Sequence, residues 1–246
     1  MRILRAAGFS VEEAVGEVRK IGKEESEVLL LDKNGYGGER ASHAFMFQYM
    51  PYTIISVLCY VIGFIMVDYR QKEIRQRMQC SSVSLRRQNL QLVAAYLVIG
   101  AAFWGICMVL AIFMYGKGFL SDPNKIYYMI NAFSMILVSL TISFVIGVLV
   151  ETLEVINGVV NVLSLGMSFL CGVFVPVSLL SEGVRSVSRF LPVYWYEQVV
   201  EIIADNAVFS TEQFQKIWQC IGIQLLFAAA ILSVGLVISK YKQQEQ

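Results

Sequence analysis

Five long apolar runs constrain the fold of this chain more than any other feature. They cover approximately residues 47–67, 92–115, 126–150, 155–175 and 217–239. A helix needs about 20 apolar residues to cross the hydrocarbon core of a bilayer, and each run reaches roughly that length. The whole chain is 57% hydrophobic and 16% charged, against roughly 45–50% and 25% in soluble domains. The sequence therefore predicts an all-α membrane protein with five transmembrane helices.

The segment between the first two runs, residues 68–89, is strongly basic. Its cationic residues are Arg70, Lys72, Arg75, Arg77, Arg86 and Arg87. A short basic loop between two spans stays in the cytoplasm under the positive-inside rule. Alternation of the spans then places 116–125 and 176–216 outside, and 151–154 and the C-terminus in the cytoplasm. The first run also contains Pro51, which we place in the first turns of its helix, where a missing amide is tolerated.

Residues 1–44 are more polar than the rest of the chain. Ser10 and Glu13 form a capping box before a predicted helix at 11–22, and 27–32 reads as a short strand. One helix and one strand cannot bury a core. We therefore expect a small α/β remnant of a larger extracytoplasmic domain, with the N-terminal region outside. Because no signal peptide begins the chain, at least one upstream span is expected to be missing.

The segment 176–216 alternates short apolar pieces with proline and arginine residues. Pieces of this length are typical of re-entrant or interfacial helices. The aromatic residues at 194–196 are expected at the level of the lipid headgroups. Glu197, Glu201 and Asp205 recur every four residues, so they predict the water-facing side of an interfacial helix.

The apolar runs contain a few uncharged polar residues and no charged residue near their middle. Asn131 and several hydroxyl residues lie in the third run, and Asn157 and Asn161 lie one turn apart in the fourth. Such groups either join helices by hydrogen bonds or line a substrate path. A mid-span charge costs at least about 2.5–3.5 kcal/mol, and ion-coupled carriers often retain one, so its absence disfavours ion-driven transport.

No sequence motif points to catalysis. The chain lacks a phosphate-binding GxxxxGK[ST] loop and the HExxH and GxSxG motifs, so we predict no catalytic residue and no ATP hydrolysis by this chain. The single histidine, His43, is expected to be an interfacial side chain. The five scattered cysteines are expected to pack as small apolar residues, and no metal site is predicted. No basic patch is interleaved with aromatics, which disfavours nucleic-acid binding.

Four stretches resemble the permease subunit of bacterial ABC-2 type ATP-binding cassette transporters, in the group with an extracytoplasmic domain between the first and second spans. They read FMFQYMPYTIISVLCYVIGFIM, KEIRQRMQCSSVS, CGVFVPVSLL and RFLPVYWY. The likeness implies a permease domain over 45–240 that contains the last five spans of such a subunit. It also implies that 1–44 ends the extracytoplasmic domain and that 241–246 is a cytoplasmic tail.

The same resemblance implies a mechanism and its partners. Two permease copies, identical or homologous, would sit in the plasma membrane on cytoplasmic ATPase subunits that bind ATP and Mg²⁺, so this chain itself binds no cofactor. The coupling helix that receives the ATPase motion would contain Glu73, Ile74, Arg77, Ser81 and Ser84. The substrate path of the exporter would include Gln48, Tyr52, Thr53, Ser56, Asn157 and Asn161.

Two other functions are compatible with five spans. A membrane-anchored sensor or immunity protein would bind a ligand through its outer domain, and its activity would depend on residues 1–44. An intramembrane enzyme is disfavoured, because the spans lack an inward catalytic pair. A permease should instead lose ATP-dependent transport when Glu73 and Arg77 are replaced by alanine. The substrate itself stays open among lipids, peptides, drugs and polysaccharides.

Overall fold

The computed structural model describes residues 40–69, 71, 76 and 85–244. All of them belong to the unit Asn34–Gln246, one of the two compact units into which the chain divides. Across this described part every regular element is a helix, which confirms the predicted all-α class. The helix expected at 11–22 and the strand expected at 27–32 lie outside the described residues.

Five helices are long and apolar enough to cross a membrane, as predicted. They are α3 (Ser42–Tyr69), α5 (Leu85–Leu120), α6 (Lys125–Leu149), α7 (Leu153–Cys171) and α10 (Thr211–Gln244). Three shorter elements separate α7 from α10, namely η1 (Val177–Leu179), α8 (Glu182–Ser188) and α9 (Pro192–Asp205). At about 1.5 Å per residue, α9 is about 21 Å long and too short to span. These elements occupy the segment that we predicted to be re-entrant or interfacial, and its position in the membrane stays a prediction.

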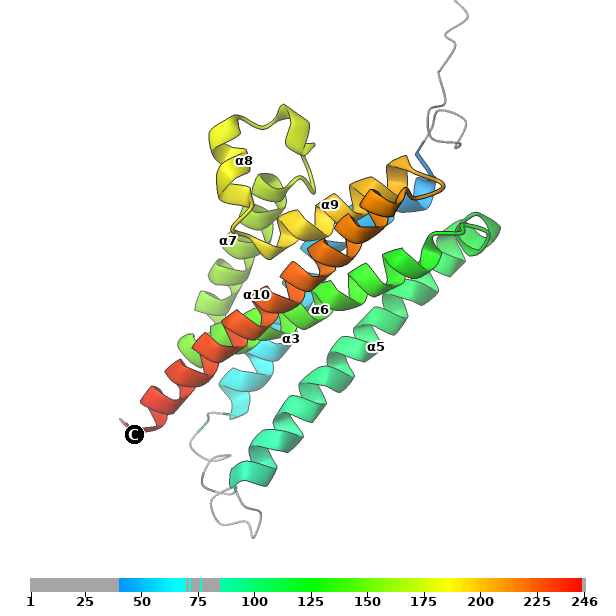
Figure 1. The fold of residues 1–246 in the computed structure, drawn as a ribbon. Helices are drawn as coiled ribbons and strands as arrows, with labels where there is room; N and C mark the ends of the chain where they lie inside the picture. Colours follow the sequence, from blue (N-terminus) through cyan, green and yellow to red (C-terminus); the bar gives the residue numbers. More distant parts are fainter. Residues whose placement is uncertain (1–39, 70, 72–75, 77–84, 245–246) are drawn as a thin grey trace, which may run out of the picture. The chain divides into compact units, whose positions relative to one another are not determined.

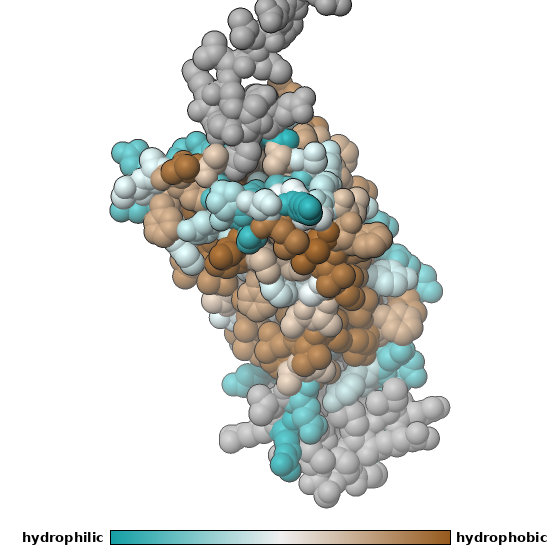
Figure 2. Space-filling view, turned by 90° about the vertical axis from the view of Figure 1, so that its right-hand side faces the viewer, coloured by the Kyte–Doolittle hydropathy of each residue, from teal (hydrophilic) through white to brown (hydrophobic). Residues whose placement is uncertain are grey.

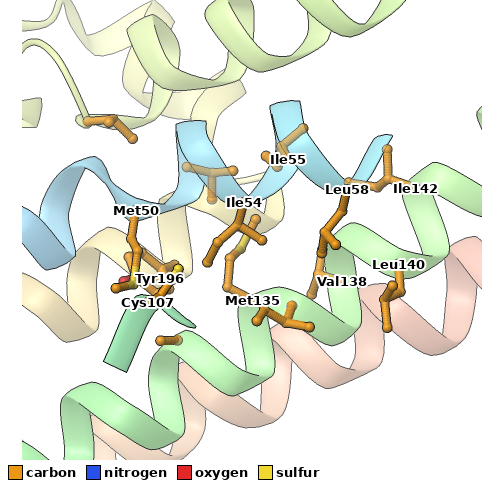
Figure 3. Packing of buried hydrophobic residues seen from close by; sticks show 14 of the residues in the cluster. Met50, Ile54, Ile55, Leu58, Cys107, Met135, Val138, Leu140, Ile142 and Tyr196 are labelled. Atoms are coloured by element: carbon orange, nitrogen blue, oxygen red, sulfur yellow. The ribbon is translucent and has the colours of Figure 1, made fainter. Parts of the chain in front are cut away.

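The core is centred on α6, which is the most buried of the five spans and packs most extensively against α3 and α10 (Figure 1). Figure 3 shows Ile54 and Leu58 of α3 opposite Met135 and Val138 of α6, and all four side chains are buried. Gly147 of α6 permits this close approach, because a Cβ there would lie 2.7 Å from Cγ of Met66. Apolar packing of α3 on α6 therefore provides the frame on which the other helices are placed.

The end of α7 differs from the prediction. We expected this span to continue to Val175 and to stop at Pro176, but the helix ends at Cys171. Gly172 has φ +105°, a left-handed conformation that glycine adopts most readily. The amides of Val173 and Phe174 then donate back to the carbonyl of Ser168. This cap turns the chain sharply into η1 before the proline is reached.

The loop between α5 and α6 is also shorter than predicted. We expected the second span to end at Tyr115 and a turn to run from Gly116 to Pro123. In the structure α5 has a kink at Gly116, continues to Leu120, and leaves a tight turn over residues 121–124. The apolar Phe119 accounts for the extra turn of helix, because its ring is buried against the core.

Consecutive spans run in opposite directions, so their termini collect at two ends (Figure 1). We call one the basic end: it holds the last turn of α3, the first turn of α5 and the end of α10. The other, termed the α9 end, holds the beginning of α3, the turn at 121–124, and α9. On the face shown in Figure 2, hydrophobic residues form a broad band with hydrophilic residues towards both ends. This distribution suits a chain that crosses a bilayer.

Candidate functional site

A pocket of about 380 Å³ lies between α3 and α7. Its lining residues are Ser56, Val57, Tyr60, Val61, Asn157, Val160 and Asn161. We call it the amide groove. Three of the six predicted path residues, Ser56, Asn157 and Asn161, therefore come together, although α3 and α7 are nearly a hundred residues apart in sequence. Whether a substrate passes there stays a prediction.

The polar groups of the amide groove are unusual for a membrane span. The side chains of Asn157 and Asn161 are exposed on α7, and the buried Oγ of Ser56 has no hydrogen-bond partner among the described residues. An amide that meets hydrocarbon without a partner is costly. Gly158 and Gly166 on the same helix also face open space in the described part of the chain. Amides and glycines of this kind suit contact with water or with another helix rather than lipid tails.

The other predicted path residues lie elsewhere. Gln48 donates its Nε2 to the carbonyls of Gly172 at 3.4 Å and Val173 at 3.2 Å, so it ties the beginning of α3 to the turn after α7. The ring of Tyr52 packs against Phe174, with 5.3 Å between centroids. Thr53 is exposed one turn before the groove residues of α3, but it does not line the groove. The structure thus divides the six residues into a groove set and an anchoring set, with Thr53 in neither.

The predicted coupling residues Glu73, Ile74, Arg77, Ser81 and Ser84 lie outside the described residues, so their role stays a prediction. The helices that flank them are described. The C-terminus of α3 and the N-terminus of α5 meet at the basic end (Figure 1).

A second pocket, of about 230 Å³, opens at the α9 end. Its lining residues are Arg40, Ala44, Phe45, Gln48, Gly172, Pro176, Val177, Glu197, Val200, Glu201 and Ala204. We call it the α9 pocket. Its walls come from the beginning of α3, the turn after α7 and one side of α9, which are segments far apart in the sequence.

We had predicted that all three acidic residues of α9 face water, and this prediction is wrong for one of them. Glu197 is only 6% exposed, whereas Glu201 is exposed and Asp205 forms an ion pair with Arg40 at 2.8 Å. The error arises because α9 packs against α3, α6 and α10 at once, which turns the first of the three carboxylates inward. Sequence spacing identified the shared face of the helix but not the neighbours that cover part of it.

Glu197 titrates far from its usual range. Burial raises the pKa of its carboxyl well above the ordinary value of about 4.5, and the negative charge of Glu201 raises the pKa further. Its Oε1 atom has no hydrogen-bond partner within the described chain. Burial therefore favours the neutral, protonated form of this carboxyl.

This raised pKa predicts that the protein loses stability as the pH rises. Above the ordinary glutamate pKa, the unfolded state releases a proton that the folded state keeps. The contribution of Glu197 to the free energy of unfolding is therefore complete below the unfolded-state pKa, and it is lost as the pH rises to the folded-state pKa. The loss is about 1.4 kcal/mol per pH unit within this window. Unfolding of the wild type and of Glu197→Gln, measured from about pH 5 to about pH 8, should diverge steadily. Glu212→Gln, at an exposed position in the first turn of α10, is the control, and a Glu197→Gln difference that is independent of pH would contradict the assignment.

Tyr196 is also buried inside the protein, and its predicted place at headgroup level stays a prediction. Its hydroxyl donates to the carbonyl of Phe47 at 2.8 Å. We had predicted Pro51 in the first turns of its helix, but α3 begins at Ser42, so the proline lies inside the helix. The carbonyl of Phe47 is therefore free to accept the tyrosine. A proline has no N–H to donate to the residue four positions earlier. The tyrosine thus satisfies the acceptor that the proline leaves unpaired.

His43, which we predicted at the membrane interface, is buried inside the protein, and its depth in the membrane stays a prediction. It is 4% exposed, and its Nε2 lies 2.6 Å from Oδ2 of Asp122. The other carboxylate oxygen of Asp122 accepts the backbone N–H of Asn124 at 2.6 Å. Three aromatic rings pack edge-on against the imidazole, those of Tyr115, Phe119 and Tyr128. This pair joins the beginning of α3 to the turn between α5 and α6.

A hydrogen-bonded network joins α6, α9 and α10. Asn131 donates to the carbonyl of Tyr196 at 3.1 Å and accepts from Nε2 of Gln224 at 2.9 Å. Ser134 donates to Oε1 of Gln224 at 2.6 Å. These bonds confirm for Asn131 and Ser134 that polar residues in the third span link helices. The buried free cysteines are Cys59, Cys107, Cys171 and Cys220, as expected of packing residues. Among the described residues no cluster of metal-ligating side chains occurs.

Comparison with known proteins identifies the family. The sequence model of the family described as "ABC-2 family transporter protein" matches residues 19–240. Neither a curated protein nor a solved structure matches the chain. The match spans all five apolar helices and both pockets, and membership implies a membrane transport component that associates with an ATP-binding subunit. The chain therefore belongs to the ABC-2 family of transporter proteins, as a multi-pass permease of the plasma membrane.

Proposed function

We propose that this permease is the membrane subunit of an exporter driven by a partner ATPase, and that the amide groove forms part of its substrate path. The observation that supports this most strongly is the pairing of Asn157 and Asn161 on an exposed face of a membrane-spanning helix. Together with the buried hydroxyl of Ser56, they offer donors and acceptors at membrane depth. A path that must accept polar parts of a substrate needs such groups.

The orientation follows from charge. The basic end lies in the cytoplasm, because the loop between α3 and α5 is rich in arginine and lysine, and Lys240 and Lys242 near the C-terminus agree with this. The α9 end is then extracytoplasmic. The ATPase docks on the coupling segment around Glu73 and Arg77 and holds ATP and Mg²⁺, while this chain supplies the moving helices.

A second permease copy, identical or homologous, covers the amide groove. The exposed amides of Asn157 and Asn161 then face a shared path, and Gly158 and Gly166 allow the second copy to approach closely. Disulfide cross-linking between copies of an Asn161→Cys variant in native membranes tests this arrangement. Phe113→Cys on α5, where the native ring is 86% exposed, is the control that should not cross-link. Equal cross-linking at both positions would contradict the proposed interface.

Replacing both amides tests the path itself. We expect Asn157→Leu with Asn161→Leu to reduce substrate export, or substrate-stimulated ATP hydrolysis by the purified complex, by about tenfold or more, which corresponds to about 1.4 kcal/mol. The physical reason is the loss of both polar side chains at membrane depth. The matched variant Asn157→Gln with Asn161→Gln keeps the amides and should retain much of the activity. Full activity of the leucine variant would contradict a role of these amides in transport.

A further inference from the structure

We propose that the α9 pocket binds a primary ammonium group and that the carboxylate of Glu197 is its counterion. This inference goes beyond the proposed function, because it names a ligand chemistry for a second site and requires no ATPase. It rests on a cavity, a buried carboxyl oxygen without a hydrogen-bond partner among the described residues, and the charge of the surrounding side chains.

The cavity has the size and the walls of a small-molecule site. Its volume is about 230 Å³, enough for an amine with a short apolar body. Apolar walls come mainly from Ala44, Pro176, Val177, Val200 and Ala204. Polar groups are few, as in most ligand pockets, where a small number of them sets the orientation of the ligand.

Glu197 is the polar residue of this pocket with a buried atom that lacks a hydrogen-bond partner among the described residues. The side chain is 94% buried, lines the cavity, and its Oε1 has no hydrogen-bond partner within the described part of the chain. A buried acceptor without a partner is costly, so native proteins rarely retain one without a use. An ammonium group has three donors and no acceptor. It therefore complements this carboxyl, and the amide oxygen of Gln48 on the opposite wall is a further acceptor.

The charges around the cavity favour a cation over an anion. The guanidinium of Arg40 is bound by both carboxylate oxygens of Asp205, at 2.8 and 3.1 Å, so its charge is largely compensated. Glu201 at the rim accepts from Gln198 at 3.2 Å and adds a negative charge. With Glu197 ionised, these side chains carry a net negative charge. An anionic ligand would meet repulsion here, and an ammonium would meet attraction.

Binding must exchange a proton. Below the raised pKa of its carboxyl, Glu197 is the neutral acid in the empty site, so an arriving ammonium forms an ion pair only when the carboxyl releases its proton to solvent. The ammonium keeps its own protons, and one proton leaves per ligand bound. The ionisable groups around the carboxyl are Arg40, Glu201 and Asp205 at the pocket, with Cys171 and Tyr196 beside it. Binding should therefore strengthen as the pH rises while the amine stays protonated.

The test uses the full chain in phosphatidylcholine nanodiscs, with n-hexylamine as the probe and n-hexanol as its uncharged counterpart. We expect saturable binding of hexylamine by calorimetry, with an apparent Kd that falls as the pH rises, by up to about tenfold per pH unit. Hexanol should bind at least about tenfold more weakly. Glu197→Gln should weaken hexylamine binding about tenfold or more and abolish its pH dependence. Glu212→Gln, at an exposed position in the first turn of α10 and outside the pocket lining, should change the Kd by less than about threefold.

A second arm identifies the source of the ammonium group. If a lipid headgroup occupies the pocket, phosphatidylethanolamine nanodiscs should raise the apparent Kd for hexylamine in the wild type and not in Glu197→Gln. An unchanged Kd would assign the pocket to a free amine. Equal Kd values of the wild type for hexylamine and hexanol would overturn the proposal. A folded Glu197→Gln variant that binds hexylamine with the Kd of the wild type would also overturn it. Because no ATPase is present, either result leaves the transport proposal untouched.

Discussion

Alanine at both Glu73 and Arg77 is expected to abolish ATP-driven transport while the permease remains folded. These residues lie in the basic segment that joins α3 to α5, where we place the contact with the ATPase. Under the proposed coupling role, losing both charges would remove the polar contacts of this segment with the ATPase. ATP-dependent export should fall by about a hundredfold or more, since about 3 kcal/mol of coupling would be lost. The measurement is transport by the purified complex in proteoliposomes, with thermal unfolding as the check on folding.

The control for this experiment is Lys240→Ala, which removes a positive charge at the basic end from α10 instead of the coupling segment. It should leave transport within about twofold of the wild type, as expected of an exposed charge. If the Glu73 and Arg77 variant transports normally, the motion of the ATPase enters the permease elsewhere. If the variant no longer co-purifies with the ATPase, the segment contributes to docking as well as to transmission.

His43→Leu is expected to destabilise the permease by about 3–5 kcal/mol, because it leaves the buried carboxylate of Asp122 without its partner. Both side chains are at most 5% exposed, so water cannot replace the lost contact. The measurement is unfolding of the purified protein in detergent. Arg40→Ala is a matched control at the same end of the molecule, because it breaks the exposed ion pair with Asp205. It should cost no more than about 1 kcal/mol.

A double variant separates the pair from its parts. His43→Leu combined with Asp122→Leu removes both polar groups, so the combined loss should be clearly smaller than the sum of the single losses. Additive losses, or a His43→Leu effect below about 1 kcal/mol, would show that the two side chains do not act as a pair.

The sequence was sufficient for the spans but not for their mutual orientation. Hydropathy located five helices because a bilayer requires long apolar runs, and only their ends differed, as at Gly172, whose left-handed backbone ended α7 before Pro176. Whether a polar residue faces the bundle depends on helices that are distant in sequence. His43 and Asp122 are 79 positions apart, and no local spacing predicts their contact. The same limit led to the wrong environment for Glu197.

The candidate path was predicted in part for the same reason. Ser56, Asn157 and Asn161 meet because α3 packs along α7, and polar residues within apolar helices already marked them as exceptional. Gln48 is also a polar residue within an apolar helix, but its side chain donates a hydrogen bond to the carbonyl of Gly172 in the turn after α7. Sequence alone does not distinguish a polar side chain with such a structural partner from one that is free to contact a ligand.

Pro51 has a consequence for how movement passes through α3. Pro51 lies between Gln48, which lines the α9 pocket, and Ser56, which lines the amide groove. Because proline has no N–H, α3 lacks the backbone hydrogen bond from residue 51 to the carbonyl of Phe47. A helix bends most easily where its ladder of bonds is interrupted. Pro51 is therefore the point at which α3 bends most easily, and the hydroxyl of Tyr196 bound to the carbonyl of Phe47 restrains that bend.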